Sequence, residues 1–457
     1  MRASDRRKFR PYLDGQGLEY GVRQGSRLGF QTRFNADRII VSGCALLSLS
    51  VQVLTHDTVL VDLELSKECV VYNNPSANPF LALMPLMAWS QALSHLMVSI
   101  SAFHVSHRLI INHSQTPSKN TPPSSNEHGR WYSNSNYDRQ KSQMALRTAM
   151  SSKQQALQRL KHELQDRPEQ NGDAVLATVL LFVNLDVVEF GGRGWKHHLR
   201  GAHELVRTRK ALIKDENSDS AKWLQYFDTA CTTFGILGAT LTPSHTLGFQ
   251  ASTPFDSAFL DTLRRSEHQT WIGCPADLLS LLHVLNTLRT MPNESSQRDE
   301  IATTLLDGLH TFSPSAWAND FPDPQHYQSR YNLAHAYKAA IGIYASHITG
   351  PTSDHPSEPN ILDLTQLGVS HMLQIPANDF HIKSLVWPAF VLGAETQRTD
   401  LRQKVQGIFQ DIWVSSCCYN VRTAAEILDV IWSRQDNDAE RTWLDYIWEQ
   451  DESWLFL

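Results

Sequence analysis

The sequence predicts an all-α fold, an irregular array of helices that forms one large domain behind a poorly structured N-terminal segment. From Asn78 onward, apolar residues recur every three or four positions, which is the spacing of one face of an α-helix. Polar segments rich in Pro, Ser and Asn separate these stretches, as expected of solvated loops between helices. The chain shows no self-similarity at a fixed period of about 20 to 50 residues, so a regular solenoid is not indicated.

This periodicity divides the chain into two parts. Residues 1–56 have no clear period and begin with a basic run, whereas residues 57–457 carry the helical pattern. At the boundary, the sequence DTVLVDLELSKECVVYNN is compatible with a short strand pair or with a frayed helix. Neither a secretory signal nor a membrane span is expected, because the apolar run from Ile39 to Leu54 is shorter than the roughly 20 residues that cross a bilayer.

The first helical stretches differ in how much of their surface is apolar. The stretch 173–190 is apolar nearly all round, so it is expected in the interior of the helical array. The sequence GGRG at 191–194 then breaks the chain into a tight turn. The stretch 138–164 is amphipathic and is expected to bury one apolar face. That face consists of Leu146, Met150, Leu157, Leu160 and Leu164.

The stretch 273–289 also predicts a buried amphipathic helix. Pro275 stands at the expected first helical position, and Asp277 complements the positive N-terminal end of the helix dipole. The apolar face of this helix consists of Leu278, Leu281, Leu282, Leu285 and Leu288. Further helical stretches are expected at 219–241, 330–348, 380–413, 420–434 and 440–450.

Composition excludes several classes of protein. Lys and Arg number 41 against 47 Asp and Glu, and the net charge of -6 lacks the strong positive balance of a polycationic nucleic-acid-binding protein. The hydrophobic content of 41% suffices for a large core. The cysteines are scattered without a C-x-x-C pair, which argues against a disulfide scaffold and favours a reducing compartment. They are Cys44, Cys69, Cys231, Cys274, Cys417 and Cys418.

The stretch WKHHLRGAHELVRTRK, from Trp195 to Lys210, holds three histidines and raises the question of a metal site. On a helix, His198 and His203 lie about 140° apart around the axis, and His197 lies about 100° from His198. A helical zinc pair needs two histidines three or four residues apart on one face. The stretch therefore predicts helix packing. Its apolar stripe consists of Trp195, Leu199, Ala202 and Val206.

Other candidate sites lack a complete set of residues. His104 and His107 are three residues apart and form the better metal pair, but no third ligand accompanies them. Asp379, Glu395 and Asp400 offer carboxylates for a glycosidase-type reaction, which depends on a separation that the sequence does not give. The chain has no G-x-S-x-G elbow, no phosphate loop and no dinucleotide-binding glycine pattern. No catalytic or metal-binding residue is therefore assigned.

Five segments, taken in order, resemble a known family. They are VVYNNPSANPFLALMPLMAWSQALSHLMVSISAFHVSH, AVLATVLLFVNLDVVEFGGRGWKHHLRGAHELV, WIGCPADLLSLLHVLNTL, AYKAAIGIY and LVWPAFVLGAETQRTDLRQKV. Together they are similar to the fungal-specific transcription factor domain, the all-α regulatory region of fungal zinc-cluster transcription regulators, from about Asp57 to the C-terminus. The resemblance implies regulation of RNA polymerase II transcription in the nucleus, through a regulatory and dimerisation domain.

The resemblance also implies a structural role for the pattern W-x-x-H-L-x-G-A-x-x-L. In this chain the pattern matches Trp195, His198, Leu199, Gly201, Ala202 and Leu205. The histidine is then part of a packing motif, and the stretch needs no metal. The alternative interpretation is a helical enzyme or small-molecule-binding protein that shares only the helix-packing pattern.

One departure from the family concerns DNA binding. Such regulators usually carry an N-terminal cluster of six cysteines that binds two zinc ions, and the first 40 residues here contain no cysteine. We expect no cofactor, and zinc only if the gene model omits that cluster. DNA contact is expected indirectly, through a homo- or heterodimer with other fungal transcription regulators, and no membrane contact is expected. The basic residues expected to serve nuclear import or phosphate contact are Arg6, Arg7, Lys8 and Arg10.

Overall fold

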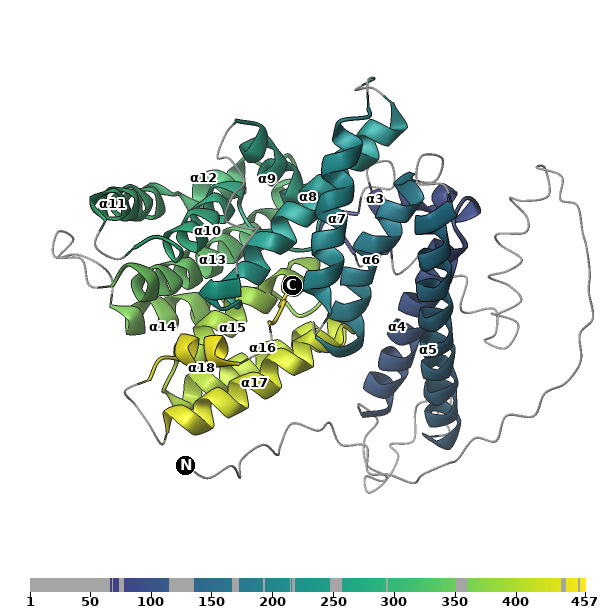
Figure 1. Ribbon diagram of the computed structural model, residues 1–457. Helices are drawn as coiled ribbons and strands as arrows, with labels where there is room; N and C mark the ends of the chain where they lie inside the picture. The colour runs from purple at the N-terminus through teal and green to yellow at the C-terminus, as the bar shows by residue number, and fades with distance from the viewer. Residues whose placement is uncertain are drawn as a thin grey trace, which may run out of the picture.

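The computed structural model (Figure 1) describes most of the chain from Ser66 to Leu457. Every regular element within the described ranges is a helix, which confirms the predicted all-α fold. Among these residues no helix has both the length and the apolar character needed to cross a membrane. The described ranges are 66–67, 69–73, 78–114, 135–166, 172–191, 194–213, 215, 218–246, 257–292, 295–350, 360–436, 441–450 and 453–457.

The first half of the described chain runs from α3 to α9. Short polar side chains begin several of these helices: Asn78 accepts the Phe80 N–H at the start of α3, and Ser218 accepts the Ala221 N–H at the start of α8. The elements are α3 (Pro79–Leu83), the 3₁₀ helix η2 (Met84–Ala88), α4 (Gln91–Ser114), α5 (Ser135–Asp166), α6 (Gly172–Phe190), α7 (Trp195–Lys210), α8 (Asp219–Thr240), η3 (Ser244–Thr246) and α9 (Ser257–Gln269).

The second half runs from α10 to α18. The left-handed backbone of Cys417, with φ of 54°, ends α16 and turns the chain into α17. Thr442 and Asp445 form a reciprocal capping box at the start of α18. The elements are α10 (Ala276–Leu288), α11 (Ser296–Thr311), α12 (Pro314–Asn319), η5 (Pro324–His326), α13 (Tyr327–Thr349), α14 (Ile361–Met372), η6 (Phe380–Leu385), α15 (Val386–Glu395), α16 (Thr399–Ser416), α17 (Tyr419–Gln435) and α18 (Trp443–Glu449).

Several predicted boundaries differ from the structure, and the stretch predicted at 380–413 is divided into η6, α15 and α16. Pro275 stands one residue before α10 and not at its first helical position. The sequence MPNESSQRDE was predicted as a loop, but α11 begins at Ser296 and includes its last five residues. Polar and acidic residues suit both a loop and the first turn of a helix, where they complement the unpaired N–H groups. Composition alone therefore placed this boundary too late.

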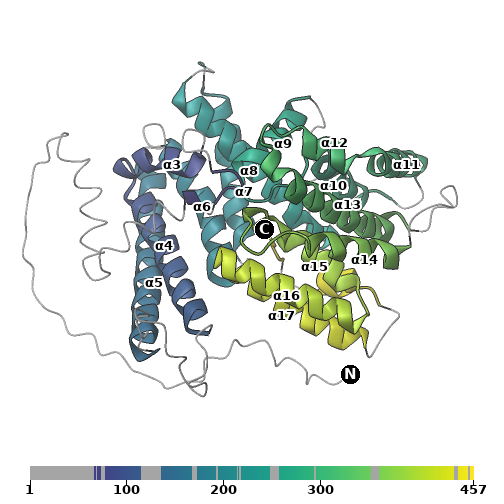
Figure 2. The same ribbon diagram turned by 180° about the vertical axis from the view of Figure 1, so that it is seen from behind.

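The helices form an irregular array with the C-terminal segment at its centre. Helices α4 and α5 lie side by side at one end, and α11 lies at the other end (Figures 1 and 2). Between them, α6 packs on α4, α7 and α8, and α13 packs on α12, α14 and α15. Helix α17 contacts both α15 and α6, so the last part of the chain joins the two ends.

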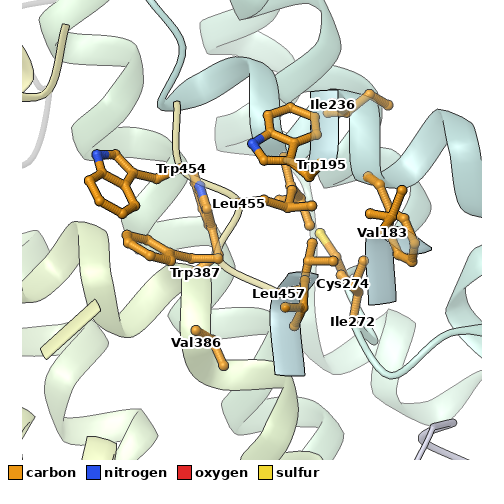
Figure 3. Packing of buried hydrophobic residues seen from close by; sticks show 14 of the residues in the cluster. Val183, Trp195, Ile236, Ile272, Cys274, Val386, Trp387, Trp454, Leu455 and Leu457 are labelled. Atoms are coloured by element: carbon orange, nitrogen blue, oxygen red, sulfur yellow. The ribbon is translucent and has the colours of Figure 1, made fainter. Parts of the chain in front are cut away.

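The core follows the most apolar stretches of the sequence. Helix α6 is buried on nearly all sides, as its composition predicts, and every residue of α15 from Val386 to Ala394 is buried. The last residues of the chain, Leu455 to Leu457, enter the same core beside Trp195 and Trp387 (Figure 3). Each leucine buried in this way contributes about 1.5–3 kcal/mol, so the C-terminal segment is part of the folded core.

The predicted buried face of α5 is wrong. Of its five residues only Leu160 is buried, and the other four are more than two-fifths exposed: Leu146, Met150, Leu157 and Leu164. The buried face of α5 instead consists of small residues, with Ala145, Ala149 and Ala156 fully buried. The Ser99 hydroxyl of α4 donates to the backbone oxygen of Ala149 at 2.9 Å, a contact that requires close helix packing. Small side chains permit this approach, and leucines at the same positions would prevent it.

In α10 the predicted leucine face is largely confirmed. Leu278, Leu282, Leu285 and Leu288 are buried, and Leu281 is partly buried against α11. Helix α10 lies between α8, α9, α11 and α13, so its apolar face meets neighbours on several sides. Periodicity correctly identified a helix with an apolar face in both α5 and α10. The leucines are buried in α10 because neighbouring helices cover them, and most of them are exposed in α5 because its neighbours do not.

Candidate functional site

The predicted import or phosphate-contact residues lie outside the residues that the structure describes. They are Arg6, Arg7, Lys8 and Arg10. The whole segment 1–56 lies outside the described ranges, so the predicted division at residue 56 and the role of these basic residues stay predictions. The candidate site is therefore built from the helical part of the chain.

Helix α7 holds the motif that resembles the family pattern. The Trp195 indole N–H donates to the backbone oxygen of Ser453 at 3.0 Å, which ties α7 to the buried C-terminal segment. A Cβ atom at Gly238 of α8 would overlap the Trp195 ring, so this position requires glycine. The buried side chains of α7 are Trp195, Leu199, Ala202 and Val206, the four that the apolar stripe predicts.

The other motif residues also lie in helix contacts. The His198 ring stacks on Phe182 of α6, with ring centroids 5.0 Å apart. Burial lowers the pKa of His198 to about 4, so the ring is neutral at neutral pH. Gly201 faces Val179 of α6 at van der Waals distance, and Leu205 is partly buried. The structure thus places the motif between α6, α8 and the C-terminal segment.

His104 and His107, the better metal pair, are both buried in α4. His107 Nδ1 lies 2.9 Å from the backbone oxygen of Cys417, and its ring packs on Trp413 and Tyr419. Burial lowers the pKa of His104 to about 3 and that of His107 to about 4. Among the described residues, no three His, Cys, Asp or Glu side chains form a group suited to a metal ion.

The three carboxylates considered for hydrolysis have separate sets of partners. Asp379 Oδ1 lies 2.7 Å from His381 Nδ1, and Asp400 is paired with Arg398 at the surface. Glu395 Oε2 lies 2.7 Å from His347 Nε2 and accepts the Trp443 indole N–H at 2.9 Å. Each carboxylate therefore has its own set of partners, which gives no support to a paired acid and base.

Tyr72 stands at the centre of a second polar cluster. Its hydroxyl accepts from Arg330 at 2.6 Å and lies 3.1 Å from His381 Nε2, whose ring also contacts Asp379. Burial raises the pKa of Tyr72 to about 12. Burial also acts to raise the pKa of Asp379, but hydrogen bonds from His381 and Ser329 outweigh it and hold that pKa at about 2. The cluster holds the segment around Tyr72 against η6 and α13.

An apolar cavity of about 60 Å³ lies in the core, between α4, α6, α15 and the C-terminal segment. Met84, Met97 and Ile100 form one wall, Leu181 and Val188 of α6 form another, and Leu457 closes it from the C-terminus. A water molecule needs about 10–15 Å³ of such space, so the cavity has room for a few small atoms or groups. Unbranched methionine side chains also adjust their shape readily around a ligand.

The polar side chains that line this cavity are Ser66, Asn184, Lys383 and Ser416. Asn184 of α6 is 7% exposed, and its buried Oδ1 accepts no hydrogen bond from the described part of the chain. Lys383 of η6 is also buried and lines the cavity. Burial raises the pKa of the nearby Cys418 thiol, which keeps it protonated and unreactive. The cavity is therefore mainly apolar, with Asn184 among its few polar lining residues.

Sequence reasoning did not find this cavity. Asn184 lies in a mostly apolar helix that also contains Thr178, Asp186 and Glu189, so no single polar residue stood out as a signal. Lys383 and Leu457 come from segments far along the chain, and only the folded array brings them to Asn184.

The described part of the chain is thus an all-helical domain with a mainly apolar core cavity. The family model described as "Fungal specific transcription factor domain" matches residues 65–457, so the chain belongs to this family. The chain is 24% identical over 414 residues to the acriflavine sensitivity control protein acr-2 of Neurospora crassa. That match covers 86% of this chain and 65% of the relative, a little under two thirds of its length. No solved structure matches the chain.

Proposed function

We propose that the protein is a fungal transcription regulator that acts in the nucleus, on RNA polymerase II transcription, through its helical domain. The observation that carries the proposal is the family match, which extends over residues 65–457 and so includes the whole described array. We expect no catalytic activity, because the candidate residues His198, Asp379 and Glu395 are engaged in contacts with neighbouring side chains.

The direct test is the transcriptome after rapid depletion of the protein. A regulator changes a defined set of transcripts within minutes, and the tagged chain accumulates in the nucleus. The relative is named for control of acriflavine sensitivity, so growth on acriflavine is a second readout to measure. An unchanged transcriptome together with exclusion from the nucleus would contradict the proposal.

We further propose that this chain does not read DNA sequence by itself and acts through a partner that does. Its net charge is -6 and its first 40 residues contain no cysteine. The purified chain should contain no stoichiometric zinc, and selection from random duplexes at physiological salt should enrich no motif. One or two zinc ions per chain, or an enriched motif, would overturn this part of the proposal.

The basic N-terminal residues are proposed to direct nuclear import. Replacing Arg6, Arg7 and Lys8 with alanine should reduce nuclear accumulation without changing the melting temperature of the protein. A matched control replaces Arg207, Arg264 and Lys404, which are exposed basic residues of the helical part. Equal nuclear accumulation of both variants and the wild type would remove the import role.

A second candidate function, binding of a small effector, is favoured by the apolar core cavity of about 60 Å³, whose lining includes the polar side chain of Asn184. Isobutyramide is a suitable probe, since it is small and largely apolar and carries an amide that can pair with the amide of Asn184. Methyl isobutyrate is the matched control because it has no donor. Stabilisation by the amide alone, lost in Asn184→Leu, supports an effector site, and equal responses to both compounds exclude one.

A further inference from the structure

Helix α5 has two faces of different chemistry. One face packs closely on α4 through small residues, and the hydroxyls of Ser99 and Ser106 bond to the α5 backbone at Ala149 and Ser142. Lys153 forms an ion pair with Glu189, which attaches α5 to α6. These contacts use the side of α5 that faces the molecule, and the remaining surface faces solvent.

The solvent side of α5 carries an aligned row of large apolar side chains. Leu146, Met150, Leu157 and Leu164 are 42%, 47%, 43% and 46% exposed, respectively, and are called the α5 stripe. At 100° per residue they fall within about 40° around the helix axis, and they extend over about 27 Å. Single exposed leucines are common on protein surfaces, but an aligned row of this length indicates an interaction surface.

The spacing of the α5 stripe indicates a helical partner. Met150, Leu157 and Leu164 are seven residues apart, the repeat by which two helices pack side by side. The stripe is also narrow and has no aromatic residue, whereas helices that lie on membranes usually present a wider apolar face with Trp or Phe. A helix of another protein therefore fits the α5 stripe better than a lipid surface does.

The charges around the α5 stripe indicate which charge the partner helix should carry. Of the α5 side chains whose exposure is described, several Arg and Lys are exposed, whereas no Asp or Glu is in the exposed class. Glu163 is engaged instead, accepting from the Ser90 hydroxyl at 2.7 Å and from the Ala92 N–H at 3.0 Å. Arg147 and Lys161 flank the stripe on one side, at about 100° and 60° from Leu146. This basic border complements an acidic helix.

A second copy of α5 does not fit this border. Antiparallel pairing that places Leu146 opposite Leu164 would bring Arg147 of one copy close to Lys161 of the other. Parallel pairing would set each basic residue beside its own counterpart. Like charges at these positions oppose association, whereas acidic residues would gain from it.

We propose that the α5 stripe binds an acidic amphipathic helix of a partner protein, with leucine-like residues at seven-residue spacing and Glu or Asp beside them. The proposed regulatory role makes a protein of the transcription machinery the expected source, but the binding itself is measured without any transcription. Failure of binding and failure of the regulatory role are therefore separate results.

The probe is a fluorescent peptide of three heptads with leucine at the core positions and glutamate at the flanking ones. Controls are a peptide with scrambled leucines and one with lysine in place of glutamate. Fluorescence anisotropy with the full chain should show binding of the acidic peptide alone, weakened by salt. Met150→Gln/Leu157→Gln should weaken it by at least about tenfold, and Arg147→Glu/Lys161→Glu should shift preference to the lysine peptide.

The matched control variant is Leu362→Gln/Leu367→Gln on α14, whose two leucines are 47% and 45% exposed. It should bind the acidic peptide like the wild type, and all variants should keep the wild-type melting temperature. Three results would overturn the proposal: equal binding of the peptide by the α5 variant, preferential binding of phosphatidylserine vesicles, or self-association that the α5 variant abolishes.

Discussion

Helices α5 and α6 are neighbours in the sequence but differ in how far their large apolar side chains are buried. Helix α6 has apolar residues nearly all round, is surrounded by α4, α7, α8 and α17, and buries almost all of them. Helix α5 lies at one end of the molecule, buries alanines and serines against α4, and leaves the α5 stripe exposed. The comparison shows that an apolar face is buried only where a neighbour is present to cover it.

The largest expected effect is the loss of stability when a leucine covered by neighbouring helices is changed. Leu282 of α10 is fully buried, and Leu282→Asp places a carboxylate there without a partner. We expect the free energy of unfolding to fall by about 4 kcal/mol or more. Urea denaturation of the two proteins measures it. Melting like the wild type would mean that this leucine face is not covered in solution.

Acid should lower the free energy of unfolding through two buried histidines of α4. The pKa values of His104 and His107, about 3 and 4, lie below the usual 6.5 because of burial. The unfolded chain takes up these protons near pH 6.5 and the folded protein only near pH 4 or below. Their contribution to stability is therefore complete above about pH 6.5 and is lost as the pH falls towards 4.

Thermal unfolding across this pH range is the measurement for the two histidines. The variant His104→Gln/His107→Gln should show a flatter dependence of melting temperature on pH, even if it melts lower at neutral pH. A slope equal to that of the wild type would show that these two side chains do not control the acid response.

A smaller effect of opposite sign is expected at the core cavity. Asn184→Leu removes a buried oxygen that has no hydrogen-bond donor in the described part of the chain, and it fills apolar space. The free energy of unfolding should rise by about 1 kcal/mol, since an unpaired buried polar group costs about 1–3 kcal/mol. Urea denaturation provides the test, and a loss of stability would mean that Asn184 has a partner in the folded protein.

The smallest effect on stability is expected at the α5 stripe. Met150→Gln/Leu157→Gln replaces exposed side chains with residues of similar helix propensity, so the free energy of unfolding should change by less than about 0.5 kcal/mol. Circular dichroism during thermal unfolding measures this. A loss of about 2 kcal/mol or more would place the stripe inside the fold and remove the contrast with α6.

The sequence predicts where the helices lie along the chain better than it predicts how they pack on one another. The apolar stripe of α7, from Trp195 to Val206, is buried as expected, because one face of this short helix is clearly apolar. In α5 the leucine row and the alanine row lie on different faces, and periodicity favoured the leucines although the alanines permit the closer approach to α4. Neither row by itself shows which face of α5 packs against another helix.

The core cavity was beyond sequence reasoning for a related reason. Two of its polar groups, Asn184 and Lys383, lie in different halves of the chain, and the C-terminal Leu457 is also part of the wall. Neither residue belongs to a motif with a recognisable spacing. Only the arrangement of α6, η6 and the C-terminal segment reveals that they share one space.

Tethering the protein to a promoter tests the central claim most directly, which is that the helical domain regulates transcription and presents α5 to a partner. The chain is fused to a heterologous DNA-binding domain, and transcription of a reporter with its binding sites is measured in a fungal cell. We expect the wild-type fusion to change reporter output, the α14 variant to match it, and Met150→Gln/Leu157→Gln to lose most of the change at equal protein level. A wild-type fusion with no effect on the reporter, or an α5 variant as effective as the wild type, would contradict the account.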